Sequence, residues 1–263
     1  TMRNTIKGHF RRGQKLFMFP HAARPNLFND LPDGEPYAEI KAQFVVSDGH
    51  RQVLQSYGYS RPLESIGWYL CPLKDFQPSD KVRSVLFAPM HPNADGSLSN
   101  EYKKLNHDVF IWLFELVQVG AIDLTVRHVY SLALNNIPRM ENVRYVTGKP
   151  DQSYQDIDEA DVIVSAQTFG YLAVARGKPV VMMGDNLRPH SGSESRRNLA
   201  YVKSWDKYRE LITFPYDIQS KADTMGILQR VAKSDAKILD WKARMIGMPF
   251  DGREFVWKVE KYL

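Results

Sequence analysis

One stretch, Asp156–Asp185, constrains the fold of this chain more than any other, because it reads as two buried strands joined by a helix. The apolar runs Asp161–Ser165 and Val180–Met183 predict the strands, and Thr168–Ala175 predicts the helix between them. Continuous apolar runs indicate strands that are covered on both faces. A strand–helix–strand unit of this length is a right-handed crossover between parallel strands.

The same alternation of buried strands and helices extends over the rest of the chain. The further predicted strands are Lys15–Pro20, Phe44–Ser47, Leu63–Trp68, Val82–Pro89, Ile122–Val126, Val143–Val146 and Leu211–Phe214. The further predicted helices are Gly49–Tyr57, Asn100–Val119, Lys221–Lys233, Lys237–Met245 and Arg253–Tyr262. This order predicts an α/β protein whose main part is a doubly wound, Rossmann-like parallel sheet of six strands.

Two parts of unequal size are expected. Leu70–Lys81 contains two prolines and no helical pattern, so we interpret it as a hinge or linker. Residues 1–80 then form a short N-terminal α/β part with the linker, and residues 81–263 form the Rossmann-like nucleotide-binding domain. Thr1 precedes Met2, and we expect the chain to be a fragment or an expressed domain.

The end of the first buried strand in Asp156–Asp185 is the first candidate site. Ligands of open parallel sheets bind beyond the carboxyl ends of the strands. Ser165 lies at such an end, and Thr168-Phe169-Gly170 opens a helix, whose free backbone N–H groups favour a phosphate. The alternative is that Ser165 and Thr168 are only loop and capping residues.

An acidic run precedes this strand. Its members are Asp156, Asp158, Glu159 and Asp161. Their position before a strand favours a solvated turn and helix cap over an acid–base pair.

Composition limits the partners and the compartment. The single cysteine, Cys71, excludes an intrachain disulfide, which fits a reducing compartment, and we expect a cytoplasmic protein. No apolar run approaches the length of a membrane span. The net charge of +5 and the pI of about 9.1 permit an anionic partner such as nucleotide phosphates, nucleic acid or an anionic membrane, without selecting among them.

Several familiar motifs are missing from the sequence. It contains neither a GxGxxG after the first strand nor a GxxxxGK[ST], which argues against dinucleotide dehydrogenases and P-loop enzymes. It also lacks CxxC, HExxH and GxSxG, and its seven histidines are scattered, so we expect no metal site. No cofactor is expected.

Three segments carry a resemblance to a known family. Phe44–Trp68 (FVVSDGHRQVLQSYGYSRPLESIGW) resembles a family strand, a helix and a "GY.R…..G" strand, and Ser84–Pro92 (SVLFAPMHP) resembles a strand that ends in "vLfaP". Asp161–Met183 resembles the block "aDvvisdSs….Ea.a.gkPvi", and Arg127-His128 stands where the family often has "R.HP". The chain is thereby similar to the C-terminal nucleotide-binding half of GT-B glycosyltransferases. The nearest group contains the CDP-glycerol glycerophosphotransferases and the UDP-N-acetylglucosamine 2-epimerases.

The resemblance implies roles for individual residues. His21, in PHAARP after the first strand, is similar to the histidine that such families place opposite the nucleotide as a catalytic base. The residues implied in nucleotide or phosphate binding are His128, Ser165, Thr168, Phe169, Gly170, Pro89 and His91. Transfer from a nucleotide diphosphate requires stabilisation of the negative leaving group, and helix dipoles with cationic side chains supply this without a metal.

A cationic loop follows the last strand of the Asp156–Asp185 unit. It runs from residue 184 to residue 198, and its cleft residues are Asp185, Arg188, Arg196 and Arg197. A loop at the ligand edge is placed to close on a diphosphate or to touch a polyanionic acceptor. The alternative is a solvated loop without a role in binding.

The sequence therefore predicts a metal-independent, glycosyltransferase-like enzyme with a nucleotide-activated sugar or polyol phosphate as donor and an unknown acceptor. One alternative is a nucleic-acid-directed glycosyltransferase or DNA-binding protein that uses the basic loop and a basic N-terminus (Arg3, Lys7, Arg11 and Arg12). A second is a 2-epimerase-like enzyme that acts on the nucleotide sugar. A third is a non-catalytic fragment, since Leu172 stands at the family's acidic ribose-binding position.

Overall fold

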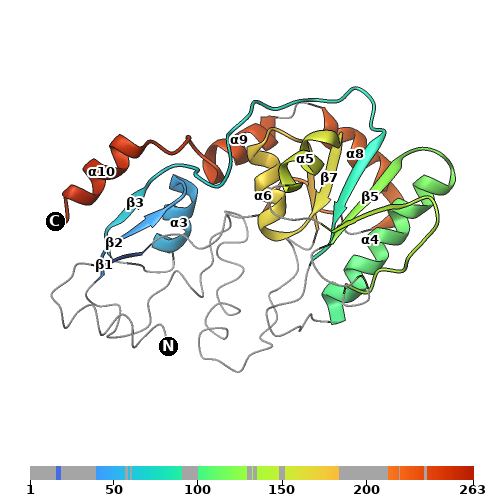
Figure 1. Ribbon diagram of the computed structural model, residues 1–263, viewed down its shortest axis with the longest axis horizontal. Helices are drawn as coiled ribbons and strands as arrows, with labels where there is room; N and C mark the ends of the chain where they lie inside the picture. Colours follow the sequence, from blue (N-terminus) through green and yellow to red (C-terminus); the bar gives the residue numbers. More distant parts are fainter. Residues whose placement is uncertain are drawn as a thin grey trace. The chain divides into compact units, whose positions relative to one another are not determined.

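The computed structural model places most of the predicted strands in two parallel sheets (Figure 1). It describes residues 16–18, 40–56, 59, 61–90, 100–128, 132, 135–147, 152–183, 213–218, 220–233 and 236–263. The chain divides into two compact units. Unit 1 contains residues 1–72, 193–212 and 242–263, and unit 2 contains residues 73–192 and 213–241.

This division differs from the predicted ranges 1–80 and 81–263 at both ends. Leu73 and the segment after it belong to unit 2, where Lys74 N–H donates to the carbonyl of Ala175 at 2.9 Å. Lys242–Leu263, expected in the nucleotide-binding domain, groups with unit 1. The sequence pattern of Lys242–Leu263 is compatible with membership of either unit, because long-range contacts decide to which unit a segment belongs.

Unit 1 has a sheet of three parallel strands in the order β1-β2-β3. The strands are β1 (Leu16–Met18), β2 (Ile40–Val45) and β3 (Leu63–Ser65), and helix α3 (Asp48–Ser56) connects β2 to β3. Phe44 of β2 is fully buried, with its ring centroid 5.3 Å from that of Phe255 in helix α10 (Gly252–Glu260). The apolar residues that predicted a strand at Phe44–Ser47 therefore belong to the hydrophobic core of unit 1.

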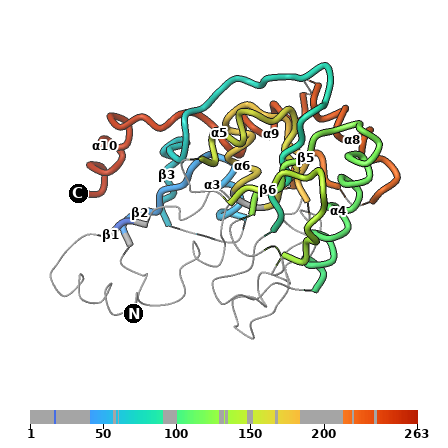
Figure 2. Tube along the Cα trace, turned by 45° about the vertical axis from the view of Figure 1, so that its right-hand side comes forward, coloured from blue at the N-terminus to red at the C-terminus, as the bar shows by residue number. Residues whose placement is uncertain are grey.

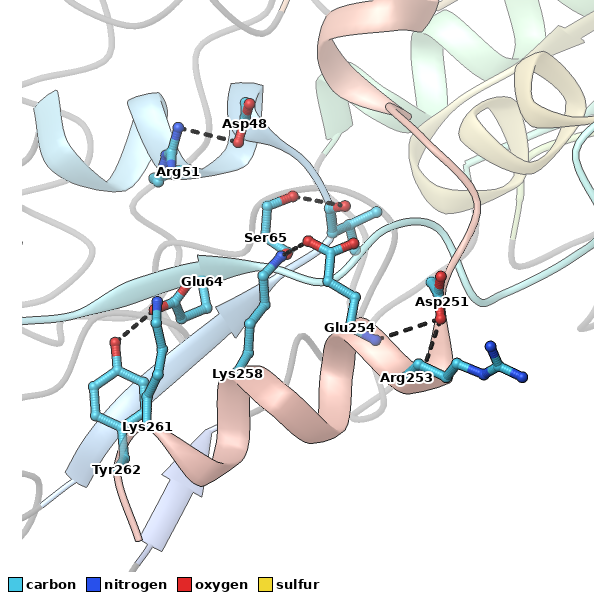
Figure 3. A network of polar contacts seen from close by, with 11 residues as sticks. Asp48, Arg51, Glu64, Ser65, Asp251, Arg253, Glu254, Lys258, Lys261 and Tyr262 are labelled. Carbon is cyan, nitrogen blue, oxygen red and sulfur yellow. Dashed lines mark hydrogen bonds and ion pairs between the residues drawn. The ribbon is translucent and has the colours of Figure 1, made fainter.

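Helix α10 is held to β3 by polar contacts (Figure 3). Asp251 caps the helix, because its carboxylate accepts from Arg253 N–H at 2.8 Å and from Glu254 N–H at 3.4 Å. At the other end Glu64 of β3 accepts from Tyr262 Oη at 2.6 Å and from Lys261 Nζ at 3.0 Å. The lost solvation and the Glu64 carboxylate together raise the pKa of Tyr262 to about 12.

Unit 2 has a sheet of five parallel strands in the order β6-β5-β4-β7-β8. The strands are β4 (Ser84–Ala88), β5 (Asp123–His128), β6 (Arg144–Thr147), β7 (Val162–Ser165) and β8 (Val180–Met182). All four pairings are parallel, and β4 and β7 are almost entirely buried. The predicted doubly wound α/β fold is confirmed.

Helices cover both faces of this sheet. Helix α4 (Asn100–Gln118) contacts β5 and α8 (Thr224–Ala232), so these two helices share one face. Helices α5 (Gln152–Glu159) and α6 (Gln167–Ala175) contact strands β4, β7 and β8 on the other face. Trp241 of α9 (Ala236–Met245) is buried against Tyr171, with ring centroids 4.9 Å apart.

Two secondary-structure predictions for unit 2 are wrong. The acidic run beginning at Asp156, interpreted as a turn, lies mostly within helix α5, because Ile157 is buried and two of the carboxylates form ion pairs. The sixth strand of the sheet is reduced to an isolated parallel bridge between Met182 and Asp217. Thr213 and Phe214, the described end of the predicted strand, are not in a strand.

Candidate functional site

The sheet of unit 2 has one point at which the winding direction reverses. From β4 the chain adds β5 and β6 on one side and then β7 and β8 on the other. Ala88 at the end of β4 is register partner to Ser165 at the end of β7, so the segments after these two strands begin side by side. The crevice outside such a switch point is where open α/β sheets bind ligands.

Helix α6 begins at this point with its backbone donors uncapped by a side chain. Ala166 occupies the N-cap position in an extended conformation (φ −125°, ψ 161°) and makes no side-chain capping bond. Thr168 and Phe169 lie in the first turn of the helix. The first N–H groups of a helix lack intrahelical partners, and together with the helix dipole they favour an anion.

Two of the predicted phosphate-binding residues have packing roles in the structure. Ser165 is fully buried, and its hydroxyl donates to the carbonyl of Ala166 at 3.2 Å. Gly170 lies against Met182 of β8, and a Cβ there would come within 2.4 Å of the Met182 sulfur. The absence of a side chain at Gly170 therefore lets α6 approach the sheet closely.

A buried arginine of β5 supports the start of α6. Arg127 is 5% exposed, and its guanidinium pairs with Asp156 and donates to Ser153 Oγ at 2.8 Å, both in α5. The same guanidinium carbon lies 5.6 Å from the ring centroid of Phe169. Arg127 thus joins α5 to the first turn of α6. In the sequence, the only indication of a role for Arg127 is its position before His128, and Arg127 was not among the predicted binding residues.

The neighbouring His128 is the last residue of β5 and is half-buried. Side chains alternate between the two faces of a strand, so His128 and Arg127 point to opposite faces. Since Arg127 contacts α5 and α6, the side chain of His128 is directed to the face that carries α4. His128 still lies at the carboxyl edge, one strand from β4.

The chain after β4 is fixed by an asparagine of helix α4. Pro89 and Met90 are buried. Met90 N–H donates to Asn106 Oδ1 at 2.9 Å, and Asn106 Nδ2 donates to the Met90 carbonyl at 2.8 Å. The same Nδ2 donates to the carbonyl of Asn135, in the connection between β5 and β6, at 3.2 Å. Asn106 thus ties together the segments that follow two adjacent strands.

A polar groove of about 330 Å³ is lined by residues of β6 and α5. Figure 2 shows the backbone course of these two elements. Its lining residues are Arg144, Val146, Thr147, Gln152, Gln155, Asp156 and Glu159. The four residues from α5 lie at helical spacing on one side of the helix. Asp156 lines this groove and also pairs with Arg127. Because Arg127 in turn contacts Phe169, the groove lies next to the residues that hold the first turn of α6.

The remaining predicted residues lie outside the described part of the chain. They are His21, His91, Asp185, Arg188, Arg196 and Arg197. For Thr168 the structure describes the backbone alone. Within the described ranges no group of three or more His, Cys, Asp or Glu side chains is arranged to hold a metal ion. No helix there is sufficiently long and apolar to cross a bilayer.

No protein-family model and no curated protein matches this sequence. Several solved structures are similar to the chain, and three of them are described here. The wall teichoic acid polymerase TagF is 12% identical with a TM-score of 0.49, over 95% of this chain and 68% of TagF. S. aureus TarM, in complex with fondaparinux, alpha-GlcNAc-glycerol and UDP, is 10% identical with a TM-score of 0.40, over 84% and 51%. The glycosyltransferase SnogD from Streptomyces nogalater is 16% identical with a TM-score of 0.42, over 88% and 58%.

These neighbours are GT-B glycosyltransferases, the group that the sequence resembles. The chain spans 68% of the TagF structure and about half to three fifths of the other two. Identities of 10 to 16% with TM-scores below 0.5 carry no information on activity, substrate or site residues.

Proposed function

We propose that this protein is a glycosyltransferase-like transferase that takes a nucleotide-activated sugar or polyol phosphate as donor and binds the donor's diphosphate at the start of α6. The observation that carries the proposal is the coincidence of two features. The uncapped first turn of α6 follows β7, and β7 lies at the switch point of the parallel sheet beside β4. A phosphate at a helix start of this kind accepts hydrogen bonds from backbone N–H groups and gains from the helix dipole.

The surrounding residues fit a leaving diphosphate. Arg127 supplies a buried positive charge next to Phe169 in the first turn, and its two partners in α5 hold it in place. Fixed donors and charges of this type stabilise developing negative charge without reorganising during the reaction. No metal ion is part of the proposal. Under the family resemblance, His21 is the base that deprotonates the acceptor hydroxyl.

A thermal-shift panel tests the donor site directly. The ligands are UDP, CDP, GDP, ADP, TDP and their common sugar or polyol conjugates. A ligand that binds only the folded protein raises the midpoint of unfolding. We expect stabilisation by one nucleotide family, and weaker stabilisation in Thr168→Ala and His128→Ala. Unchanged affinity in both variants would reject these site residues.

Separate measurements test the proposed catalytic base, His21, and the competing nucleic-acid function. His21→Ala is expected to abolish turnover and to leave donor binding unchanged, and a fully active variant would remove His21 from the mechanism. A DNA duplex in the same panel addresses the alternative, for which the described residues offer no support. A response to DNA with no response to any nucleotide would overturn the transferase proposal.

A further inference from the structure

Helix α5 contributes one carboxylate to each of two ion pairs with buried arginines. Asp156 pairs with Arg127 of β5, and Asp158 pairs with Arg176, the residue that follows α6. The two arginines are almost equally buried, at 5% and 7% exposure. They lie toward opposite edges of the sheet, because Arg127 is next to the carboxyl end of β5, whereas α6 runs back from that edge and ends at Arg176.

The aromatic rings beside the two arginines belong to different helices. The guanidinium carbon of Arg176 lies 5.2 Å from the ring centroid of Tyr154, which is in α5 like Asp158. The guanidinium carbon of Arg127 lies 5.6 Å from the ring centroid of Phe169, in the first turn of α6. The pair of Arg127 therefore connects α5 to α6, and it does so at the turn that is proposed to bind the donor phosphate.

The orientation of Arg127 depends on its partners in α5. The guanidinium pairs with Asp156 and donates to Ser153 Oγ at 2.8 Å. Two anchors fix the plane of a guanidinium, which presents its donors in a rigid fork. Removing the charge of Asp156 leaves the positive charge of Arg127 in place but removes the stronger anchor. The contact of Arg127 with Phe169 then loses its fixed geometry.

The first turn of α6 depends on such a contact. Its N-cap residue is Ala166, which makes no side-chain capping bond, and the first N–H groups of a helix have no intrahelical partners. Backbone donors bind an anion tightly when their directions are fixed beforehand, because ordering them on binding costs free energy.

We infer that Asp156 is a positioning residue of the donor site. It holds Arg127, and Arg127 holds Phe169, so that the first turn of α6 is ordered before the diphosphate binds. Asp158 forms the corresponding pair toward the other edge and has no such role. This inference rests on the proposed function and deepens it, because it assigns part of the donor affinity to a carboxylate of α5.

Hydrogen exchange tests the positioning without a ligand. In an α-helix each N–H group donates to the carbonyl four residues earlier, so the amides of residues 170–173 report on the first turn of α6. Asparagine keeps the size of aspartate and removes its charge. We expect exchange at these amides to rise about fivefold in Asp156→Asn and to stay within about twofold of wild type in Asp158→Asn, the matched control.

Isothermal titration tests the consequence for binding. The ligands are pyrophosphate, UDP, CDP, GDP and ADP. We expect Asp156→Asn to bind pyrophosphate and the preferred nucleotide about fivefold more weakly than wild type, because the donors of α6 must then be ordered on binding. Asp158→Asn is expected to bind both within about twofold of wild type.

A second pair of variants leaves both ion pairs intact. This matters because Asp156→Asn leaves a buried charge unpaired, which can prevent folding. Phe169→Leu removes the ring beside Arg127, and Tyr154→Leu, its control, removes the ring beside Arg176. We expect faster exchange and weaker pyrophosphate binding in Phe169→Leu alone. The double variant Asp156→Asn/Phe169→Leu should bind no more than about twofold more weakly than the weaker single variant, since both changes act through Arg127.

Each other outcome has a definite meaning. Unchanged exchange in Asp156→Asn and Phe169→Leu overturns the inference, and so do additive losses of affinity in the double variant. Equal losses of affinity in Asp156→Asn and Asp158→Asn overturn it as well, because they indicate a general weakening of α5. A wild-type protein that binds neither pyrophosphate nor a nucleotide overturns the proposed function and the role in donor binding, whereas exchange still decides whether Asp156 orders α6.

Discussion

The two edges of the five-stranded sheet differ in how their polar groups are satisfied. At the amino-terminal edge, Asp161 accepts from the N–H groups of Arg83 and Ser84, each at 2.8 Å. Asp158, at the end of α5, accepts from Arg176 Nε at 2.8 Å and from Lys74 Nζ at 2.9 Å. Charged groups at this edge are paired within the protein, which is typical of a surface that stabilises a fold.

The carboxyl-terminal edge has both paired and unpaired polar groups among the residues that the structure describes, since Arg127 pairs with Asp156 there. Helix α6 begins without a side-chain cap, and the first N–H groups of such a helix are available to an anion. Under the proposed function, the paired groups of the amino-terminal edge stabilise the fold, and the donor binds at the carboxyl-terminal edge. Substitutions at the amino-terminal edge should therefore change unfolding and leave nucleotide affinity unchanged.

The largest effect is expected at Gly177, in the turn between α6 and β8. Its φ is +75°, and a Cβ would lie 1.8 Å from the carbonyl oxygen of Asp75. Gly177→Ala combines the strain of a left-handed backbone with a clash against main chain, so we expect a loss of about 3 kcal/mol in the free energy of unfolding. Urea denaturation measures this loss.

Gly120 is the matched control for this variant. It also has a positive φ, +67°, but a Cβ there would meet nothing within 4 Å. Gly120→Ala should cost about 1 kcal/mol, from the backbone alone. Equal losses in the two variants would contradict the close packing of Gly177 on Asp75. A loss of nucleotide binding in folded Gly177→Ala protein would contradict the separation of the two edges.

A smaller effect is expected at Asp161. Asp161→Ala removes the acceptor for two backbone N–H groups and should lower the free energy of unfolding by about 1–2 kcal/mol, since both groups are near solvent and water partly replaces the carboxylate. Asp161→Asn keeps an acceptor oxygen and should lose clearly less. If the two variants are equally destabilised in urea, the hydrogen bonds are not the cause.

The smallest effect is a pH dependence from Asp158. The hydrogen bonds from Arg176, and then from Lys74, lower the pKa of this carboxyl from 3.8 to about 2. Its contribution to stability is therefore fully present above about pH 4 and is lost as the pH falls from 4 to 2. We expect about 1 kcal/mol, well below the full value of the shift, because the side chain is 31% exposed and the pair is screened by solvent.

Denaturation of wild type and Asp158→Asn between pH 2 and pH 6 isolates this contribution. The variant should be less stable than wild type near pH 6, and the difference should narrow toward pH 2. A constant difference over this range would show that Asp158 does not titrate with a lowered pKa in the folded protein.

Most of the elements of unit 2 could be predicted because their signals are local. The apolar runs at β4 and β7 and the helical pattern of α4 each appear within one short window of sequence. The place of the candidate site followed from them, because parallel strands expose their carboxyl ends at one edge. Helix α5 was not predicted, because its short and mostly polar sequence resembles a turn. The ion pairs that its carboxylates form with Arg127 and Arg176 are not visible in the sequence.

The sequence alone determined the class of fold and most of the alternation of strands and helices, because apolar runs are local features of the sequence. It also predicts the sheet edge at which the proposed donor binds. The tertiary structure alone decided which polar groups are paired. Arg127 meets Asp156 across 29 positions, Lys74 meets Asp158 across 84, and Lys242–Leu263 joins unit 1. These pairs form because packing of the helices and strands brings side chains together that are distant in the sequence, and a local sequence pattern carries no information on such contacts.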